Sequence, residues 1–194
     1  MPPLLARIKN IMLDPRAEWP LIATEQGGMV RILLGYVAVL AAIPAIAGFI
    51  GTTFVGASVS IGTFHDPIWV GVFKAFVSYL LSFAIVTLTA LAIDAMAPFF
   101  GAQRHFVNAL KLAAYSFTPV WLVGIVLLFP GLRLFTLLGL YALRLLWTGV
   151  HPLMGAPRNK VLLYSIAIAV AGFVIVFAMA FVQALIVYYG SAFR

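Results

Sequence analysis

The chain has 194 residues, of which 64% are hydrophobic and only 9% are charged, whereas a soluble globular domain carries about 25% charged residues. This composition excludes an ordinary soluble domain and predicts a protein dissolved in lipid. The net charge of +7 does not indicate nucleic acid as a partner, because the basic residues lie mainly between apolar runs. The absence of cysteine excludes disulfides, thiolate metal sites and cysteine nucleophiles.

Residues 1–30 form a segment of their own. Apolar residues, among them Ile8 and Ile11, recur at helical spacing around Arg7, and Pro15 then indicates the first turn of a second helix. The pattern predicts a cytoplasmic amphipathic segment of one or two short helices in the headgroup layer. A tail packed over the ends of the membrane spans is a compatible alternative.

Five apolar runs follow, each long enough for a bilayer core, which needs about 20 apolar residues per helix. The runs are continuous rather than alternating, which favours helices over a β-barrel. The sequence therefore predicts an all-α fold, a polytopic transmembrane helical bundle formed by residues 31–190. The spans are expected at about residues 32–51, 68–98, 106–128, 132–150 and 161–188.

The distribution of lysine and arginine predicts the orientation of these spans. Eight such residues lie on the side of the N-terminus and three on the other, so the positive-inside rule places the N-terminus in the cytoplasm and the C-terminus outside. The expected location is the inner membrane, with anionic lipid headgroups as partners at the cytoplasmic face. The first group is Arg7, Lys9, Arg16, Arg31, Arg104, Lys111, Arg158 and Lys160, and the second is Lys74, Arg133 and Arg194.

Three charges lie at a similar depth on three spans. At 1.5 Å per residue, Asp94, Lys111 and Arg144 each fall roughly 5–10 Å inside the cytoplasmic boundary. Ionisable groups at such depth face a partner or a water-filled cavity. One interpretation is a salt bridge between Asp94 and one cation, with the other cation reaching the headgroups. The other is a cytoplasm-facing polar pocket that holds an anionic headgroup or relays a proton.

The segment Tyr115-Ser116-Phe117-Thr118-Pro119 predicts a kink in the third span. Pro119 has no N–H, so the carbonyl of Tyr115 loses its helical partner, and Ser116 or Thr118 is expected to satisfy it. The kink is either a structural feature or a hinge beside the charge cluster.

Motifs of known catalysis are absent from the sequence, which contains no G-x-S-x-G, no H-E-x-x-H and no phosphate-binding glycine loop. We expect neither an enzyme nor a cofactor. His105 and His151 are weak metal candidates only, because neither shares helical ligand spacing with a second ligand. Small residues at helical spacing in the first and fifth spans suit close helix packing, in the chain's own bundle, in a homo-oligomer or with other membrane proteins. These are Ala38, Ala41, Ala45, Gly48, Ala167, Ala171, Ala180 and Ala184.

A longer series of residues resembles a known family. It comprises Phe100-Gly101-Ala102, His105-Phe106, Ala109-Leu110-Lys111, Ala114 to Pro119, Trp121-Leu122, Leu140-Tyr141, Leu145-Leu146, Gly149, Leu153-Met154, Pro157, Lys160 and Tyr164, together with Pro15 to Trp19. The series resembles the Yip1 family of five-span membrane proteins, in particular its short bacterial branch. The resemblance implies five spans and a cytoplasmic N-terminus. Eukaryotic members associate with Rab-type small GTPases, a property that we do not carry over. Arg144 and Asn159 depart from the family pattern, which usually has an aromatic and an acidic residue there.

Three functions remain open at this stage. The leading hypothesis is a non-enzymatic inner-membrane protein that organises the membrane or scaffolds partners through lateral contacts, and it predicts a dry, well-packed bundle. The alternative is a small transporter or channel, which predicts a continuous polar cavity at mid-membrane depth. A lipid-modifying enzyme is a weaker third option. A cavity that reaches past Pro119 toward the outer side would count against the first hypothesis.

Overall fold

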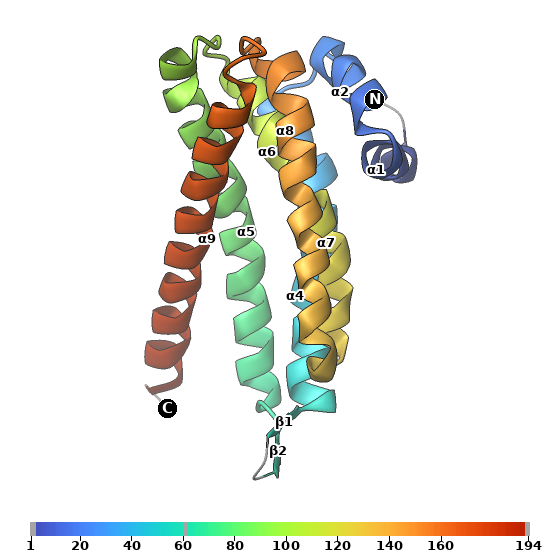
Figure 1. The fold of residues 1–194 in the computed structure, drawn as a ribbon. Helices are drawn as coiled ribbons and strands as arrows, with labels where there is room; N and C mark the ends of the chain where they lie inside the picture. Colours follow the sequence, from blue (N-terminus) through green and yellow to red (C-terminus); the bar gives the residue numbers. More distant parts are fainter. Residues whose placement is uncertain (1–2, 60–61, 193–194) are drawn as a thin grey trace.

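The computed structural model describes residues 3–59 and 62–192. Five helical segments in that part of the chain are long and apolar enough to cross a membrane, and they run side by side as a bundle (Figure 1). This confirms the predicted all-α class with five spans. The segments are Met29–Val55, Ile68–Phe100, Phe106–Leu128, Leu134–Met154 and Val161–Gly190.

Two short helices precede the first span: α1 (Leu4–Leu13) and α2 (Pro15–Thr24). The first span consists of α3 (Met29–Ile32) and α4 (Ala38–Ile50), each followed by a π-helical stretch, Leu33–Val37 and Gly51–Val55. A small antiparallel hairpin of β1 (Ala57–Val59) and β2 (Gly62–Phe64) then leads into the second span.

The second span is the long helix α5 (Ile68–Met96), closed by a 3-10 turn, Ala97–Phe100. The third span is broken into α6 (Phe106–Ser116) and α7 (Thr118–Val123), and it ends in the 3-10 stretch Gly124–Leu128. The fourth span begins as the 3-10 segment Pro130–Leu140 and continues as α8 (Tyr141–Met154). The fifth is α9 (Val161–Ala192).

The two ends of the bundle differ in what they carry. One end, here called the N-terminal end, holds α1, α2 and the connections at residues 101–105 and 155–160, while the other, the hairpin end, holds β1 and β2 (Figure 1). Gly101 and Gly155 lie at the N-terminal end with φ of +69° and +64° and terminate helices there. Glycine suits these left-handed positions because it has no Cβ.

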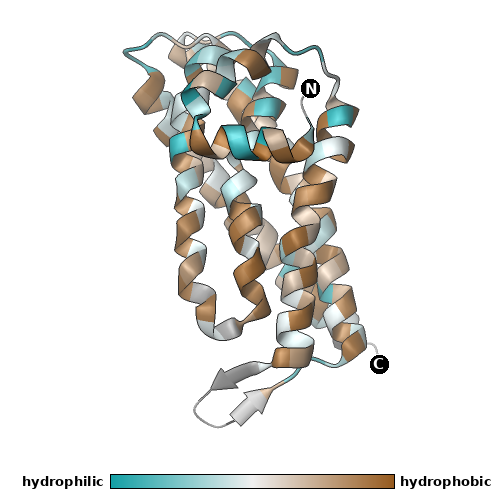
Figure 2. Ribbon diagram, turned by 90° about the vertical axis from the view of Figure 1, so that its right-hand side faces the viewer, coloured by the Kyte–Doolittle hydropathy of each residue, from teal (hydrophilic) through white to brown (hydrophobic). Residues whose placement is uncertain are grey.

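The buried core lies toward the N-terminal end. In the described part of α9, the core residues are Val161, Tyr164 and Ile168, and the rest of that helix toward the hairpin end is largely exposed to the surroundings. Figure 2 shows apolar residues along most of the length of the spans, with hydrophilic residues gathered at the N-terminal end. The packing is therefore dense at one end and loose at the other.

Helix α2 packs tightly on α8 at the N-terminal end. A Cβ added to Gly149 would lie 2.7 Å from both the Trp19 ring and a methyl group of Leu112, so only glycine allows this approach. The indole N–H of Trp19 also donates to Thr148 Oγ1 at 3.0 Å. The α1–α2 hairpin is consequently part of the packed structure.

Candidate functional site: a buried ion network at the N-terminal end

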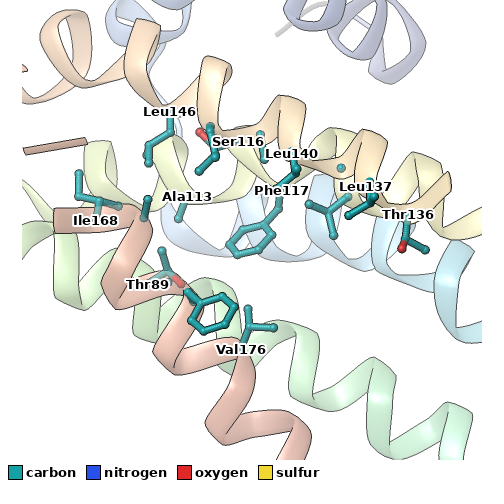
Figure 3. A pocket seen from close by; sticks show the side chains of 17 residues that line it. Thr89, Ala113, Ser116, Phe117, Thr136, Leu137, Leu140, Leu146, Ile168 and Val176 are labelled. Carbon is teal, nitrogen blue, oxygen red and sulfur yellow. The ribbon is translucent and has the colours of Figure 1, made fainter. Parts of the chain in front are cut away.

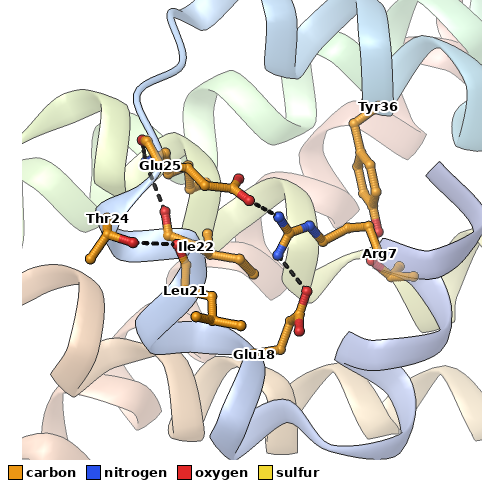
Figure 4. A network of polar contacts seen from close by, with 9 residues as sticks. Arg7, Glu18, Leu21, Ile22, Thr24, Glu25 and Tyr36 are labelled. Atoms are coloured by element: carbon orange, nitrogen blue, oxygen red, sulfur yellow. Dashed lines mark hydrogen bonds and ion pairs between the residues drawn. The ribbon is translucent and has the colours of Figure 1, made fainter. Parts of the chain in front are cut away.

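Arg7 is the centre of the most polar buried site that we find in the molecule. Its side chain is only 3% exposed, and its guanidinium donates from Nη1 to Glu18 at 2.5 Å and from Nη2 to Glu25 (Figure 4). The guanidinium also lies over the ring of Tyr115, 5.7 Å from its centroid. A buried charge is costly unless it is paired, and here both carboxylates pair with one cation.

The local sequence explains why these charges turn inward. Arg7 and Ile11 share the buried face of α1, and Glu18 lies beside Trp19 and Ile22 on the buried face of α2. Each charge thus occupies the apolar stripe of an amphipathic helix. The sequence prediction gave neither residue a buried partner, and their place on the apolar stripe was the signal that could have revealed them.

Lys111 joins this network from the third span. It is 2% exposed, and its Nζ donates to the main-chain carbonyls of Ile22 at 2.9 Å and Glu25 at 2.7 Å. These carbonyls lie at the C-terminal end of α2, where helix carbonyls lack intrahelical partners and where a cation is favoured by the helix dipole. Lys111 therefore caps α2 and ties it to α6.

A chain of hydroxyl contacts continues from the network to the break in the third span. The Tyr36 and Tyr115 rings are in edge-to-face contact at 4.5 Å, and the Tyr36 hydroxyl lies 2.7 Å from Thr118 Oγ1. Thr118 donates to the carbonyl of Tyr115 at 2.6 Å. The structure thus places the break between Ser116 and Thr118, directly before Pro119, with the Tyr115 carbonyl satisfied by Thr118. Whether this kink acts as a hinge stays a prediction.

The predicted grouping of Asp94, Lys111 and Arg144 is not what the structure shows. Asp94 pairs with Arg104 at 3.3 Å, and Arg144 lies over the ring of Tyr141 on its own helix, 5.4 Å from the centroid. No ion pair within the described residues joins any two of the three. Equal depth does not fix rotation about the helix axis: Lys111 faces α2, whereas the Arg144 side chain is exposed.

The network is balanced in charge and joins the α1–α2 hairpin to the third span, and we call it the latch. It contains two cations, Arg7 and Lys111, and two carboxylates, Glu18 and Glu25, so the formal charges cancel. Arg7 pairs with both carboxylates, whereas Lys111 donates to main-chain carbonyls. The predicted cluster of Asp94, Lys111 and Arg144 would instead carry one surplus positive charge. Removing Arg7, the cation that both carboxylates share, costs about 3–5 kcal/mol. The network therefore fixes the α1–α2 hairpin on the third span.

The histidines have structural partners. His105 precedes α6, and its Nδ1 accepts from the backbone N–H of Asn108 at 3.2 Å. Nδ1 of His151 lies 2.7 Å from the carbonyl oxygen of Ala156. Across residues 3–59 and 62–192, no group of three or more histidine, aspartate or glutamate side chains could hold a metal ion.

Two adjoining cavities occupy the looser part of the bundle. The larger, of about 350 Å³, lies between α5, the third and fourth spans and α9, and the smaller, of about 240 Å³, reaches Gly124 and Leu127 near the hairpin end. They share Phe117 and Val120 on either side of Pro119. The expectation of a well-packed bundle is therefore wrong for this region. No charged side chain lines either cavity, so the polar passage expected of a transporter is not found in the described residues.

The comparisons with known proteins give the family. The model of the Yip1 domain matches residues 9–180. The chain belongs to the Yip1 family. Within it, the chain is 29% identical over 154 residues to the inner membrane protein YohC of Escherichia coli K12, covering 79% of this chain and 78% of that protein. YohC of Escherichia coli O6:H1 matches to the same extent. No solved structure matches the chain. With its five apolar helices, this Yip1-family chain is an integral membrane protein.

Proposed function

We propose that this chain is a non-enzymatic protein of the inner membrane that organises the bilayer around it through lateral contacts. The proposal rests on the α1–α2 hairpin, which the ion network fixes to the bundle. Helix α1 lies across the direction of the spans (Figures 1 and 2) and is held there by Arg7 and Lys111. A fixed amphipathic helix at the edge of the bundle would act as a wedge in the headgroup layer of one leaflet.

The exposed surface of the hairpin has the composition of an interfacial element. Leu5, Leu13 and Leu21 are exposed apolar side chains on α1 and α2, and Lys9 and Arg16 are exposed basic ones. Apolar side chains favour insertion at the headgroup boundary, and the basic ones favour anionic lipid. The partners in this proposal are therefore anionic lipids, with the N-terminus in the cytoplasm and the C-terminus outside.

The fifth span supports lateral contacts with other membrane proteins or with a second copy. Ala180 and Ala184 are exposed on α9, where small side chains permit close approach of another helix. The cavities reach past Pro119 toward the hairpin end, which counts against this proposal. Their lining carries no charged group, however, so they do not form the continuous polar cavity that the transporter alternative predicts.

Vesicle shape tests the proposal. The purified chain would be reconstituted at one lipid-to-protein ratio in vesicles of phosphatidylethanolamine and phosphatidylglycerol, and vesicle diameters measured by electron cryomicroscopy. We expect smaller diameters than in protein-free vesicles, and a return to protein-free diameters for Leu5→Asp with Leu13→Asp. Diameters unchanged by the wild-type chain would contradict the proposal. A variant with Gln103→Asp and Asn159→Asp, at exposed positions of the N-terminal end, controls for a general effect of two added charges.

Orientation needs a separate experiment. Because the chain has no cysteine, single-cysteine variants report each side without background. A membrane-impermeant maleimide added to intact cells should label Phe64→Cys and spare Arg16→Cys, both at exposed positions. The reverse pattern would overturn the cytoplasmic N-terminus.

A further inference from the structure

The larger cavity contains two buried hydroxyl groups that lack a hydrogen-bond partner. Thr89 on α5 is 4% exposed and Ser116 at the end of α6 is 6% exposed, and neither side-chain oxygen has a partner among the described residues. Both residues line the cavity, on opposite sides of it (Figure 3). A buried hydroxyl without a partner costs about 1–3 kcal/mol. Both oxygens have almost no accessible surface, so each side chain must rotate about its Cα–Cβ bond before an acceptor in the cavity can reach it.

The remaining lining is apolar and partly aromatic. Phe117 and Phe173 contribute rings, and Leu137, Leu146 and Ile168 are among the aliphatic side chains. Aromatic rings favour stacked or edge-to-face contact with a flat ring. A cavity of about 350 Å³ lies within the range of small-molecule sites, which are mostly apolar with a few placed polar groups.

The hydroxyls lie near the middle of the membrane. Counting along the spans, Thr89 is 11 residues from Phe100, and Ser116 is 10 residues from Phe106. At 1.5 Å per residue, both lie about 15 Å from the N-terminal end of their spans, which is half of a hydrocarbon core of about 30 Å. A molecule that places acceptors at this depth must be neutral and dissolved in the hydrocarbon.

The two hydroxyls disfavour two other occupants. A partner helix bonds its main-chain carbonyls within itself, so it would leave both hydroxyls without an acceptor. A phospholipid carries its ester carbonyls and charged headgroup at the interface, and its acyl chain alone would leave both hydroxyls without partners.

We propose that this cavity binds a neutral lipid of the quinone class, a flat ring with carbonyl oxygens on opposite edges and a long apolar tail. The carbonyls accept hydrogen bonds from Thr89 and Ser116, and the ring lies beside Phe117 and Phe173. The tail follows the adjoining cavity past Phe117 toward Leu127. This site is independent of the membrane-organising role proposed above.

Binding of decylubiquinone tests the proposal. The full chain in lipid nanodiscs would be titrated with this probe, and the saturable quenching of tryptophan fluorescence followed, since Trp121 lines the adjoining cavity. We expect Thr89→Val and Ser116→Ala each to weaken binding about tenfold, the effect of one buried hydrogen bond. Gly172→Leu should abolish it, because Gly172 lines the cavity and faces open space.

Matched controls make the result decisive. Thr53→Val and Ser165→Ala also remove buried hydroxyls without partners in the described chain, but neither residue lines the two cavities, so binding should be unchanged.

Dodecylbenzene, with ring and tail but no carbonyl, should compete at least tenfold less well than unlabelled decylubiquinone. Absence of saturable quenching, or equal affinity in Thr89→Val, Ser116→Ala and the controls, would overturn the site. Equal competition by dodecylbenzene would overturn recognition of the carbonyls. If Gly172→Leu fails to fold, the two hydroxyl variants still decide.

Discussion

The N-terminal end and the hairpin end of the bundle differ in packing and in buried charge, although both are built from apolar helices. Along α9, the core residues Val161, Tyr164 and Ile168 lie toward the N-terminal end, whereas Phe173, Phe177 and Phe181 farther along are exposed. The N-terminal end buries an ion network and binds the helices α1 and α2, whereas the middle of the bundle and the hairpin end leave cavities and exposed apolar side chains. In lipid, apolar surface needs no protein partner, but a buried charge does. The charged end therefore needs specific protein partners for its buried charges, while the apolar side chains elsewhere can face lipid.

Loss of Arg7 should have the largest effect on this difference. Arg7→Met leaves Glu18 and Glu25 buried without their shared cation, so we expect a loss of about 3–5 kcal/mol in the free energy of unfolding. The measurement is reversible unfolding by sodium dodecyl sulfate in mixed micelles. Arg16→Met, at an exposed position of α2, is the control and should change stability by less than about 0.5 kcal/mol. Equal effects of the two changes would refute the latch.

Loss of Lys111 should be the second largest effect. Lys111→Met removes the two charged hydrogen bonds to the carbonyls of Ile22 and Glu25, and we expect a loss of about 2–3 kcal/mol. Lys74→Met is the control, because its pair with Asp66 is partly exposed and such pairs contribute at most about 1 kcal/mol. The same unfolding assay ranks the two. A larger loss of unfolding free energy in Lys74→Met than in Lys111→Met would contradict the role of Lys111 in fixing α2.

Two glycine substitutions sharpen the comparison of packing. Gly149→Ala would push a methyl group against Trp19 and Leu112, so we expect it to destabilise the protein by about 1–3 kcal/mol. Gly172→Ala meets open space on α9 and should be neutral or stabilise by up to about 1 kcal/mol, since alanine favours helix. Thermal unfolding followed by circular dichroism measures both. Similar effects at the two positions would mean that the N-terminal end is packed no more densely than the region around the cavity.

The smallest effect is expected at Asp94. Its partner Arg104 is 64% exposed, and exposed ion pairs contribute at most about 1 kcal/mol. Asp94→Asn should therefore fold with a loss of less than about 1 kcal/mol in the unfolding assay. A loss as large as that of Arg7→Met would show that Asp94 anchors the bundle after all.

Some of these features could be predicted from the sequence and others could not. The five spans followed from run length and composition, and the break at Pro119 followed from its missing N–H, because both depend on local chemistry. The partners of Lys111 and Arg144 could not be predicted from depth, since depth does not determine which way a side chain faces around its helix. Arg104 reaches Asp94 because the chain reverses at Gly101, a tertiary feature. Arg7 and Glu18 could have been found, because each interrupts the apolar stripe of its helix.

The central claim is that the ion network holds α1 in one position on the bundle, and an inter-label distance measures this directly. Spin labels at Leu5→Cys and Phe99→Cys, both highly exposed and free of native cysteine background, report the distance from α1 to the end of the second span by double electron–electron resonance. We predict one narrow distance distribution in the otherwise wild-type chain and a broad one after Arg7→Met. A broad distribution with Arg7 present, or a narrow one that persists without it, would contradict the latch.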